Sequence, residues 1–259
     1  MIRASVGATR EGGPLPHLTE QQRTAFRDDG YVASLDVLTR DEAEAYCVRV
    51  EEFVATVPAE HLRTKVHLDC PALLELVRWP EIVDAVSDVL GPDVLCRSSS
   101  LFIKDPHDGG FVAWHQDATY WELQSSAVVT AWLALTASTL DNGALQVIPG
   151  SHARPSMAHH QPRREGNLLT LGQELVDPVD EDRAVTLDLA PGQMSLHDGW
   201  LAHASAPNRS DSRRIGFAIR YLATHVRNTG TRRDSALLVR GVDRYAHFDV
   251  EPDSFWRKV

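Results

Sequence analysis

From about residue 94 onward, the chain consists of short apolar runs separated by turn residues. Six such runs, each four to eight residues long, are Leu101–Lys104, Val128–Leu135, Leu145–Ile148, Ala184–Leu187, Met194–His197 and Ile215–Tyr221. Asn142-Gly143 and Pro191-Gly192 are strong turn signals between them. Short strands joined by tight turns are typical of a β-sandwich or a closed barrel. The sequence therefore predicts a mostly β fold for this part of the chain.

The preceding part of the chain predicts helices instead. Two capping boxes begin at Thr19 and Thr39, and Gly30 is placed to end the first helix. A third helix is expected over 81–90, where apolar residues recur at helical spacing. Amphipathic helices usually bury their apolar stripe. We therefore expect these helices to flank the β structure as a supporting layer.

Composition excludes several classes of protein. The 26 basic and 36 acidic residues give a net charge of -10, which argues against a nucleic-acid partner and an anionic membrane surface. Residues 1–16 lack the apolar core of a signal peptide and are expected to be a disordered tail, followed by a single domain over 17–259. The three cysteines are widely spaced without a C-x-x-C motif, which fits a reducing cytoplasm.

The triplet His115-Gln116-Asp117 is the strongest chemical signal in the chain. In extended backbone, residues i and i+2 point to the same face, so one ion can contact both outer side chains. Two imidazoles and one carboxylate cover one face of an Fe(II) octahedron and leave positions open for a co-substrate and O2. The 88-residue gap from His115 to His203 predicts a second ligand on the far side of a barrel. His197 is the alternative to His203.

The triplet alone is weak evidence, because the chain contains 12 histidines. A histidine beside an acid is commonly an ordinary polar pair. The downstream segment adds weight, since Arg214 follows His203 by eleven residues. A planar guanidinium suits the distal carboxylate of a keto acid. Arg213 is expected on the opposite face of the same strand, as a surface charge.

Four separated motifs share the order and spacing of one known family. They are Trp114-His115-Gln116-Asp117, Asp141-Asn142-Gly143-Ala144-Leu145, Ile148-Pro149-Gly150-Ser151-His152, and His203-x-Ser205-x-Pro207-Asn208-x-Ser210 with Arg214. Together they resemble the phytanoyl-CoA dioxygenase family of Fe(II)/2-oxoglutarate-dependent oxygenases, over roughly residues 19 to 250. The resemblance implies a double-stranded β-helix, which is a jelly-roll, cupin-like barrel with flanking helices and iron at its mouth.

The resemblance also implies roles for individual residues. His115, Asp117 and His203 would bind Fe(II). Arg214 would bind the C5 carboxylate of 2-oxoglutarate, with Ser205 and Lys104 beside it. 2-Oxoglutarate and O2 are the implied co-substrates. The implied reaction is hydroxylation of an unactivated C–H bond of a small metabolite, with release of succinate and CO2.

The carboxylate of Asp117 favours oxygen chemistry, because halogenating relatives have Ala or Gly at this position. Desaturation, cyclisation and epimerisation in natural-product biosynthesis stay open as outcomes of the same chemistry. Two other classes of protein also remain. One is a zinc-dependent hydrolase, in which Arg214 would have no role, and the other is a metal- or ligand-binding protein that has lost catalysis.

Substrate contacts are less constrained by the sequence. Tyr120 and Trp121 follow the metal motif and are candidates to line a pocket, with ordinary aromatic packing as the alternative. Arg97 is a candidate partner for an acidic substrate, with a position at the rim as the alternative. Residues 153–183 form a polar insertion that is either a lid or a solvated surface loop. The sequence does not specify an oligomeric state.

Overall fold

The computed structural model describes residues 18–123, 127–154, 156–231 and 233–252. The α-helices of this part of the chain are α1 (Glu20–Asp29), α2 (Arg40–Val54), α3 (Pro71–Val77) and α4 (Pro80–Leu90). Single turns of 3-10 helix are η1 (Ala59–Leu62), η2 (Val66–Leu68), η3 (Asp117–Tyr120), η4 (Leu140–Asn142), η5 (Ser151–Ala153) and η6 (Glu181–Arg183). The predicted tail over 1–16 lies outside the described residues.

The strands form two main sheets and one small ribbon. The seven-stranded sheet has the order β1 (Tyr31–Asp36), β9 (Gln193–Asp198), β4 (Val128–Ala134), β11 (Arg214–Ala223), β2 (Val94–Lys104), β12 (Ser235–Arg240) and β13 (Asp249–Val250). The four-stranded sheet has the order β3 (Val112–His115), β10 (His203–Ser205), β5 (Leu145–Val147) and β8 (Val185–Leu187). The ribbon pairs β6 (His159–His160) with β7 (Glu174–Leu175).

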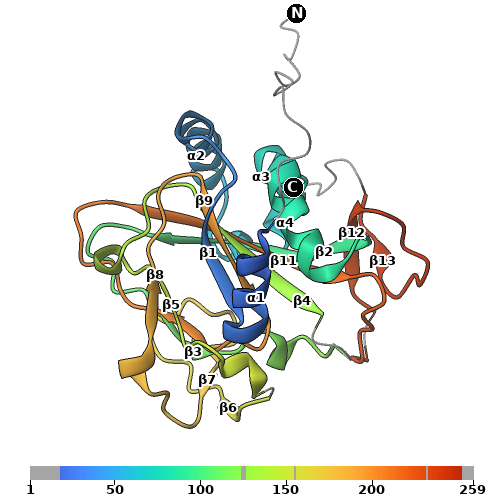
Figure 1. Cartoon of the computed structure of the whole chain (residues 1–259). Coiled ribbons are helices and arrows are strands. Elements are labelled where there is room, and N and C mark those ends of the chain that lie inside the picture. Colours follow the sequence, from blue (N-terminus) through green and yellow to red (C-terminus); the bar gives the residue numbers. More distant parts are fainter. Residues whose placement is uncertain (1–17, 124–126, 155, 232, 253–259) are drawn as a thin grey trace, which may run out of the picture.

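Helices α2, α3 and α4 and the small sheet lie on opposite sides of the large sheet (Figure 1). Apart from the parallel pair β12 and β13, neighbouring strands of the two main sheets are antiparallel. Two antiparallel sheets that face each other form the predicted jelly-roll barrel. The predicted helices α2 and α4 form a supporting layer together with α3, which was not predicted. The expectation of a mostly β fold with flanking helices is confirmed.

The helix boundaries follow from the expected caps. Thr19 and Thr39 each accept a hydrogen bond from the backbone three residues later, and both capping boxes are complete. Gly30 ends α1 in the left-handed conformation with φ 84°. α4 begins one residue before the predicted helix, at Pro80, whose missing N–H is not needed in a first turn. The short helix α3 was not predicted, because seven residues are too few to show a clear period.

Alternation along β11 separates the core from the barrel interior. Ile215, Phe217 and Ile219 pack with the helices in the main hydrophobic core. The residues between them face the other sheet, where Arg214 and Arg220 line a cavity. Because successive side chains of a strand point to opposite faces, one strand serves both the core and the cavity.

Two expectations about the metal motif need correction. His203 does not lie across the barrel from His115, since β10 pairs directly with β3 and these two histidines are register partners. The long connection leaves the small sheet and returns to it. Asp117 is also not in a strand, because it begins η3. The backbone of Gln116 is still extended, with φ -116° and ψ 128°.

No helix in the described part of the chain is long and apolar enough to cross a lipid bilayer. The cytoplasmic location stays a prediction.

Candidate metal centre

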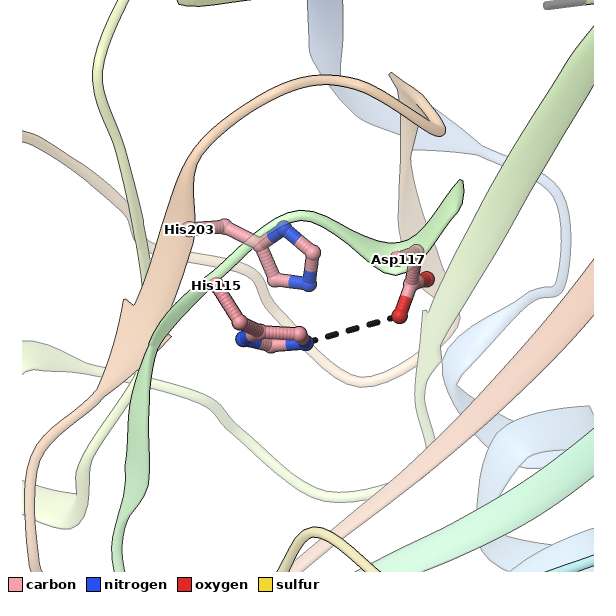
Figure 2. A group of neighbouring side chains, drawn as sticks. All are labelled: His115, Asp117 and His203. Atoms are coloured by element: carbon pink, nitrogen blue, oxygen red, sulfur yellow. Dashed lines mark ion pairs between the residues drawn. The ribbon is translucent and has the colours of Figure 1, made fainter. Parts of the chain in front are cut away.

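His115, Asp117 and His203 come together at one end of the small sheet. One ligand atom from each side chain lies within 4.8 Å of the others, and all three residues are buried. Figure 2 shows the two imidazole rings and the carboxylate pointing toward one another, with His115 Nε2 3.4 Å from Asp117 Oδ1. Among the described residues, no other group of three or more His, Cys, Asp or Glu side chains has ligand atoms close enough to hold a metal ion.

Backbone carbonyls orient both histidines in the same way. His115 Nδ1 is 2.8 Å from the carbonyl oxygen of Ala113, and His203 Nδ1 is 2.9 Å from that of Leu201. A carbonyl only accepts, so each Nδ1 carries the proton and each Nε2 is free to bind a metal. Burial, together with His115 and His197, lowers the pKa of His203 well below its ordinary value. The neutral imidazole required for metal binding is therefore favoured.

The carboxylate of Asp117 is held from the side opposite His115. Its Oδ2 accepts a hydrogen bond of 3.0 Å from Thr130 Oγ1, and Arg220 Nε lies 3.8 Å away. Burial alone would raise the pKa of Asp117, but its interaction with His115 and the charge of Arg220 lower it well below the ordinary value. The group is thus ionised, with Oδ1 directed toward the two histidines. Two imidazoles and one carboxylate are the donor set that fits Fe(II) with open positions.

His197 lies beside this group but is not part of it. Its ring centroid is 4.6 Å from that of His203, and neither ring nitrogen has a partner among the described residues. Burial lowers the pKa of His197 to about 4. The group whose ligand atoms lie close enough together to bind one metal ion contains His203 and not His197.

Ser205 and Arg214 line the cavity that also contains the three candidate ligands, and Lys104 contacts Ser205. Lys104 Nζ donates to Ser205 Oγ at 2.5 Å and to the carbonyl oxygens of Ser205 and Ala206. Arg214 Nη1 donates to Ser205 Oγ at 3.1 Å and to the carbonyl oxygen of Gly143. Both cationic side chains are almost fully buried. Arg213 lies outside, where it forms ion pairs with Glu51 and Asp105.

Among the described residues, neither of these two buried side chains forms an ion pair with a carboxylate group. Burial and the charge of Arg214 lower the pKa of Lys104 to about 6, and burial lowers that of Arg214 to about 9. Arg214 Nε is buried and has no hydrogen-bond partner among the described residues. Buried guanidinium and ammonium groups are costly unless an anion pairs with them. The site therefore fits the distal carboxylate of 2-oxoglutarate.

Gly143 makes this close packing feasible. It has φ 79°, which favours glycine, and a Cβ there would lie 2.1 Å from the carbonyl oxygen of Ala206 and 2.9 Å from Lys104 Nζ. The predicted Asn142-Gly143 turn thus brings its carbonyl oxygen to Ser205 and Arg214.

Gln116 ties the insertion to the metal motif. Its Nε2 donates to the carbonyl oxygens of Trp200 and Arg154, and its Oε1 accepts from the backbone of Met157. A further stretch of the insertion, residues 168–171 with Gln173, lines a second cavity beside Asp117. The insertion is therefore packed against the site over part of its length.

Two of the three candidate substrate residues line a cavity in the described structure. Arg97 and Trp121 line the second cavity, and the Arg97 guanidinium lies 5.6 Å from the Trp121 ring centroid. Tyr120 ends η3, and its side chain lies outside the described part of the structure.

Sequence reasoning missed several residues that line these cavities, among them Arg63, Thr130, Trp132 and Arg220. Period-two spacing could have found three of them. Arg220 follows Arg214 by six residues on one strand, and Thr130 and Trp132 alternate along another. Arg63 follows a 3-10 turn, where no periodic signal exists.

Comparisons with known proteins support the fold and show the family. The family model of phytanoyl-CoA dioxygenase (PhyH) matches residues 26–216. A probable phytanoyl-CoA dioxygenase of Caenorhabditis elegans is 26% identical over 64% of this chain, which spans 57% of that protein's length. The apo structure of the non-heme monooxygenase ThoJ is 36% identical with a TM-score of 0.80, covering 89% of this chain and 87% of its own.

A structure of CytC3 with Fe(II) and alpha-ketoglutarate is also similar. It is 25% identical with a TM-score of 0.68, and the likeness covers 90% of this chain and 93% of that chain. The motifs, the fold and the matched family model agree over most of the sequence. This chain belongs to the phytanoyl-CoA dioxygenase (PhyH) family.

Proposed function

We propose that this protein is an Fe(II)/2-oxoglutarate-dependent oxygenase that hydroxylates an unactivated C–H bond of a small molecule. One observation carries the proposal. The buried group of His115, Asp117 and His203 shares a cavity with the buried guanidinium of Arg214, whose Nε has no hydrogen-bond partner among the described residues. Lys104 lies next to it, since both side chains donate to Ser205 Oγ. A metal-dependent hydrolase would need the first feature but has no use for the second. Succinate and CO2 are the expected co-products.

His115, Asp117 and His203 are the proposed iron ligands, with His203 preferred over His197. Iron with 2-oxoglutarate and O2 supplies an oxidant strong enough to remove hydrogen from an unactivated carbon. The chain's own part is to hold the ligands in one geometry. The two backbone carbonyls and Thr130 do this through the hydrogen bonds described above.

Arg214 is the proposed partner of the 2-oxoglutarate C5 carboxylate, with Lys104 as a second cation. Ser205 Oγ lies between them and donates to the carbonyl oxygen of Gly143, so it fixes both donors in place. The Arg214 guanidinium lies 5.4 Å from the Trp132 ring centroid, which shields it from water. Preorganised donors in a dry site bind a carboxylate more strongly than exposed ones.

Arg97 and Trp121 are the proposed substrate contacts, together with Tyr120. Both described side chains line the cavity that Asp117 shares, so a substrate there would lie beside the metal ligands. Desaturation, cyclisation and epimerisation remain alternatives that product analysis would distinguish. We further propose one domain over 17–259 and a cytoplasmic location, with neither nucleic acid nor membrane as a partner.

The test is turnover with a ligand variant as the control. Succinate is measured under air with Fe(II) and 2-oxoglutarate, across amino acids, organic acids, acyl thioesters and aromatic metabolites. Wild-type protein should form succinate, with stimulation by one compound class, and Asp117→Ala should lower the rate at least ~100-fold. Equal turnover in both proteins would contradict the assignment. Ligand binding without any succinate would instead favour a protein that has lost catalysis.

A further inference from the structure

A second cavity, next to the metal centre, contains three arginines. Arg63, Arg97 and Arg220 line it, and it shares Phe102, Asp117 and Arg220 with the metal-site cavity. The Arg63 and Arg220 guanidinium groups each lie 5.8 Å from the Phe102 ring centroid. Ser100 joins the two residues, because its Oγ accepts from Arg220 Nη1 and donates to the carbonyl oxygen of Arg63, both at 2.6 Å.

A β-bulge directs Arg97 into this cavity. Along the pairing of β2 with β11, Ser98 faces Arg220 and Cys96 faces Tyr221, so the register skips Arg97. An extra residue at a bulge departs from strict alternation, and bulges next to active sites commonly re-aim a side chain. Because of the bulge, two consecutive residues of the strand, Arg97 and Ser98, both line the cavity.

Among the described residues, two of these three cations keep a guanidinium nitrogen without a hydrogen-bond partner. Arg97 pairs with Asp234 at 2.9 Å, and Arg220 lies near Asp117, whose charge a bound metal ion would offset. Arg63 Nη1 and Arg97 Nε are buried without a hydrogen-bond partner among the described residues. Burial lowers the pKa of Arg63, although Asp108 partly opposes this. Buried guanidinium groups without an anion indicate that one is supplied from outside.

2-Oxoglutarate is not that anion. Arg63 lines the second cavity but not the cavity that holds the three candidate ligands and Arg214. A five-carbon diacid that reaches from Arg214 to the metal ligands lies in the first of these cavities. An anion that contacts Arg63 as well as Arg220 therefore belongs to a second molecule, and the primary substrate is the molecule that has to approach the metal.

We propose that Arg63 and Arg220 bind an oxyanion of the primary substrate, which makes that substrate an organic acid with an apolar body. The inference rests on the proposed function and names its substrate class. The apolar body is indicated by Leu168, Leu169 and Leu171, which the insertion contributes to the cavity. The oxyanion is a carboxylate or a phosphonate-type group, because a planar guanidinium binds either in bidentate fashion.

Calorimetric binding to the protein with Fe(II) and 2-oxoglutarate, without O2 and at fixed ionic strength, tests this. The probes are hexanoate, hexylphosphonate and uncharged hexanamide. Wild-type protein should bind at least one acid ~10-fold or more tightly than the amide, corresponding to about 1.4 kcal/mol. Preference for hexanoate or for hexylphosphonate identifies the oxyanion. Equal affinity for all three, or no binding of either acid, would overturn the proposal.

Variants assign the effect to the cavity. Arg63→Gln should lose the preference for the acid, whereas Arg63→Lys should keep part of it, which a purely structural role would not produce. The matched control is Arg209→Gln, because Arg209 is exposed and lines neither cavity. An unchanged preference in both Arg63→Gln and Arg220→Gln would contradict the assignment. The assignment would also be contradicted if Arg63→Gln lost as much affinity for 2-oxoglutarate as for the acid probe.

This experiment is independent of turnover. Absence of succinate formation with intact acid binding would contradict the proposed function and leave the anion site standing. Normal succinate formation without a preference for the acid would contradict the anion site and leave the proposed function standing.

Discussion

Each residue of the metal centre is oriented by a contact that lies outside the metal motif. The histidines depend on backbone carbonyls two residues earlier, and Asp117 depends on Thr130 from another strand. The motif itself could be read from the sequence because its chemistry is local to His115 and Asp117. Thr130 could not, since only folding places it against the carboxylate.

Lys104 should make the stability of the cofactor-free protein depend on pH. Its pKa is lowered from 10.5 to about 6 by burial and by Arg214, so the unfolded chain binds more protons than the folded one between these values. The free energy of unfolding should therefore rise with pH across that range, by at most about 1.4 kcal/mol per pH unit. Lys104→Met should flatten the rise.

Urea unfolding at pH 7, 8 and 9, without Fe(II) or 2-oxoglutarate, measures this difference. Parallel pH profiles for wild-type protein and Lys104→Met would show that the buried ammonium group does not have the depressed pKa. Lys104→Met should also raise the KM for 2-oxoglutarate, because Lys104 Nζ holds Ser205, which in turn contacts Arg214.

Among the elements, β11 contributes most to the metal-site cavity, and its Arg220 lines the second cavity as well. Arg214, Ala218 and Arg220 face the barrel interior from one side of this strand, while its other side completes the hydrophobic core. Gly216 lies between them, and the Trp132 indole occupies the space above it. That indole also lies against the Arg214 guanidinium. A side chain at position 216 should therefore disturb the co-substrate site through Trp132.

Gly216→Ala tests this packing. The new Cβ would lie 2.1 Å from Trp132 Cζ2, so the indole has to move. Overpacking of this kind costs about 1–3 kcal/mol, and the KM for 2-oxoglutarate should rise with it. Gly109→Ala is the matched control, because nothing lies within 4 Å of a Cβ there. Thermal unfolding and succinate kinetics are the measurements, and equal behaviour of the two variants would contradict the packing argument.

The elements were predictable where their signals are local. Capping boxes at Thr19 and Thr39 and the apolar runs at β4 and β11 gave the correct types and nearly correct ends. Pairing was not predictable, and the far-side placement of His203 was wrong because sequence separation does not reveal that a chain returns to its own sheet. The bulge at Arg97 likewise depends on how β2 pairs with β11.

In the whole molecule, the insertion after β5 is attached to the barrel at the metal motif. Gln116 is fully buried and contacts Arg154, Met157 and Trp200 through its amide, while its backbone N–H donates to His159 at 3.0 Å. The sequence predicted an insertion but left open whether it covers the site. The polar composition of the insertion could not decide this. The contacts that attach it are made to one residue outside it, Gln116, and only folding brings them together.

Gln116→Leu should loosen the insertion. The change leaves the Met157 N–H and two carbonyl oxygens without their partners, at about 1–3 kcal/mol for each buried group. Proteolytic cleavage and hydrogen exchange within 157–183 should increase, with smaller changes in the strands of the large sheet. Gln193→Leu is the control, since Gln193 bonds Asp36 and Ala190 away from the insertion. Unchanged protection of 157–183 would show that Gln116 does not hold the insertion in place.

The central claim is that His115, Asp117 and His203 hold one Fe(II) to which 2-oxoglutarate binds while Arg214 holds its far end. Anaerobic titration of Fe(II) and 2-oxoglutarate, followed by the visible charge-transfer absorption of the chelated keto acid, tests it most directly. Wild-type protein should develop the band at one iron per chain, His203→Ala should lose it, and Arg214→Gln should require at least ~10-fold more 2-oxoglutarate. His197→Ala should retain it. A band that survives in His203→Ala, or that never forms in wild-type protein, would contradict the account.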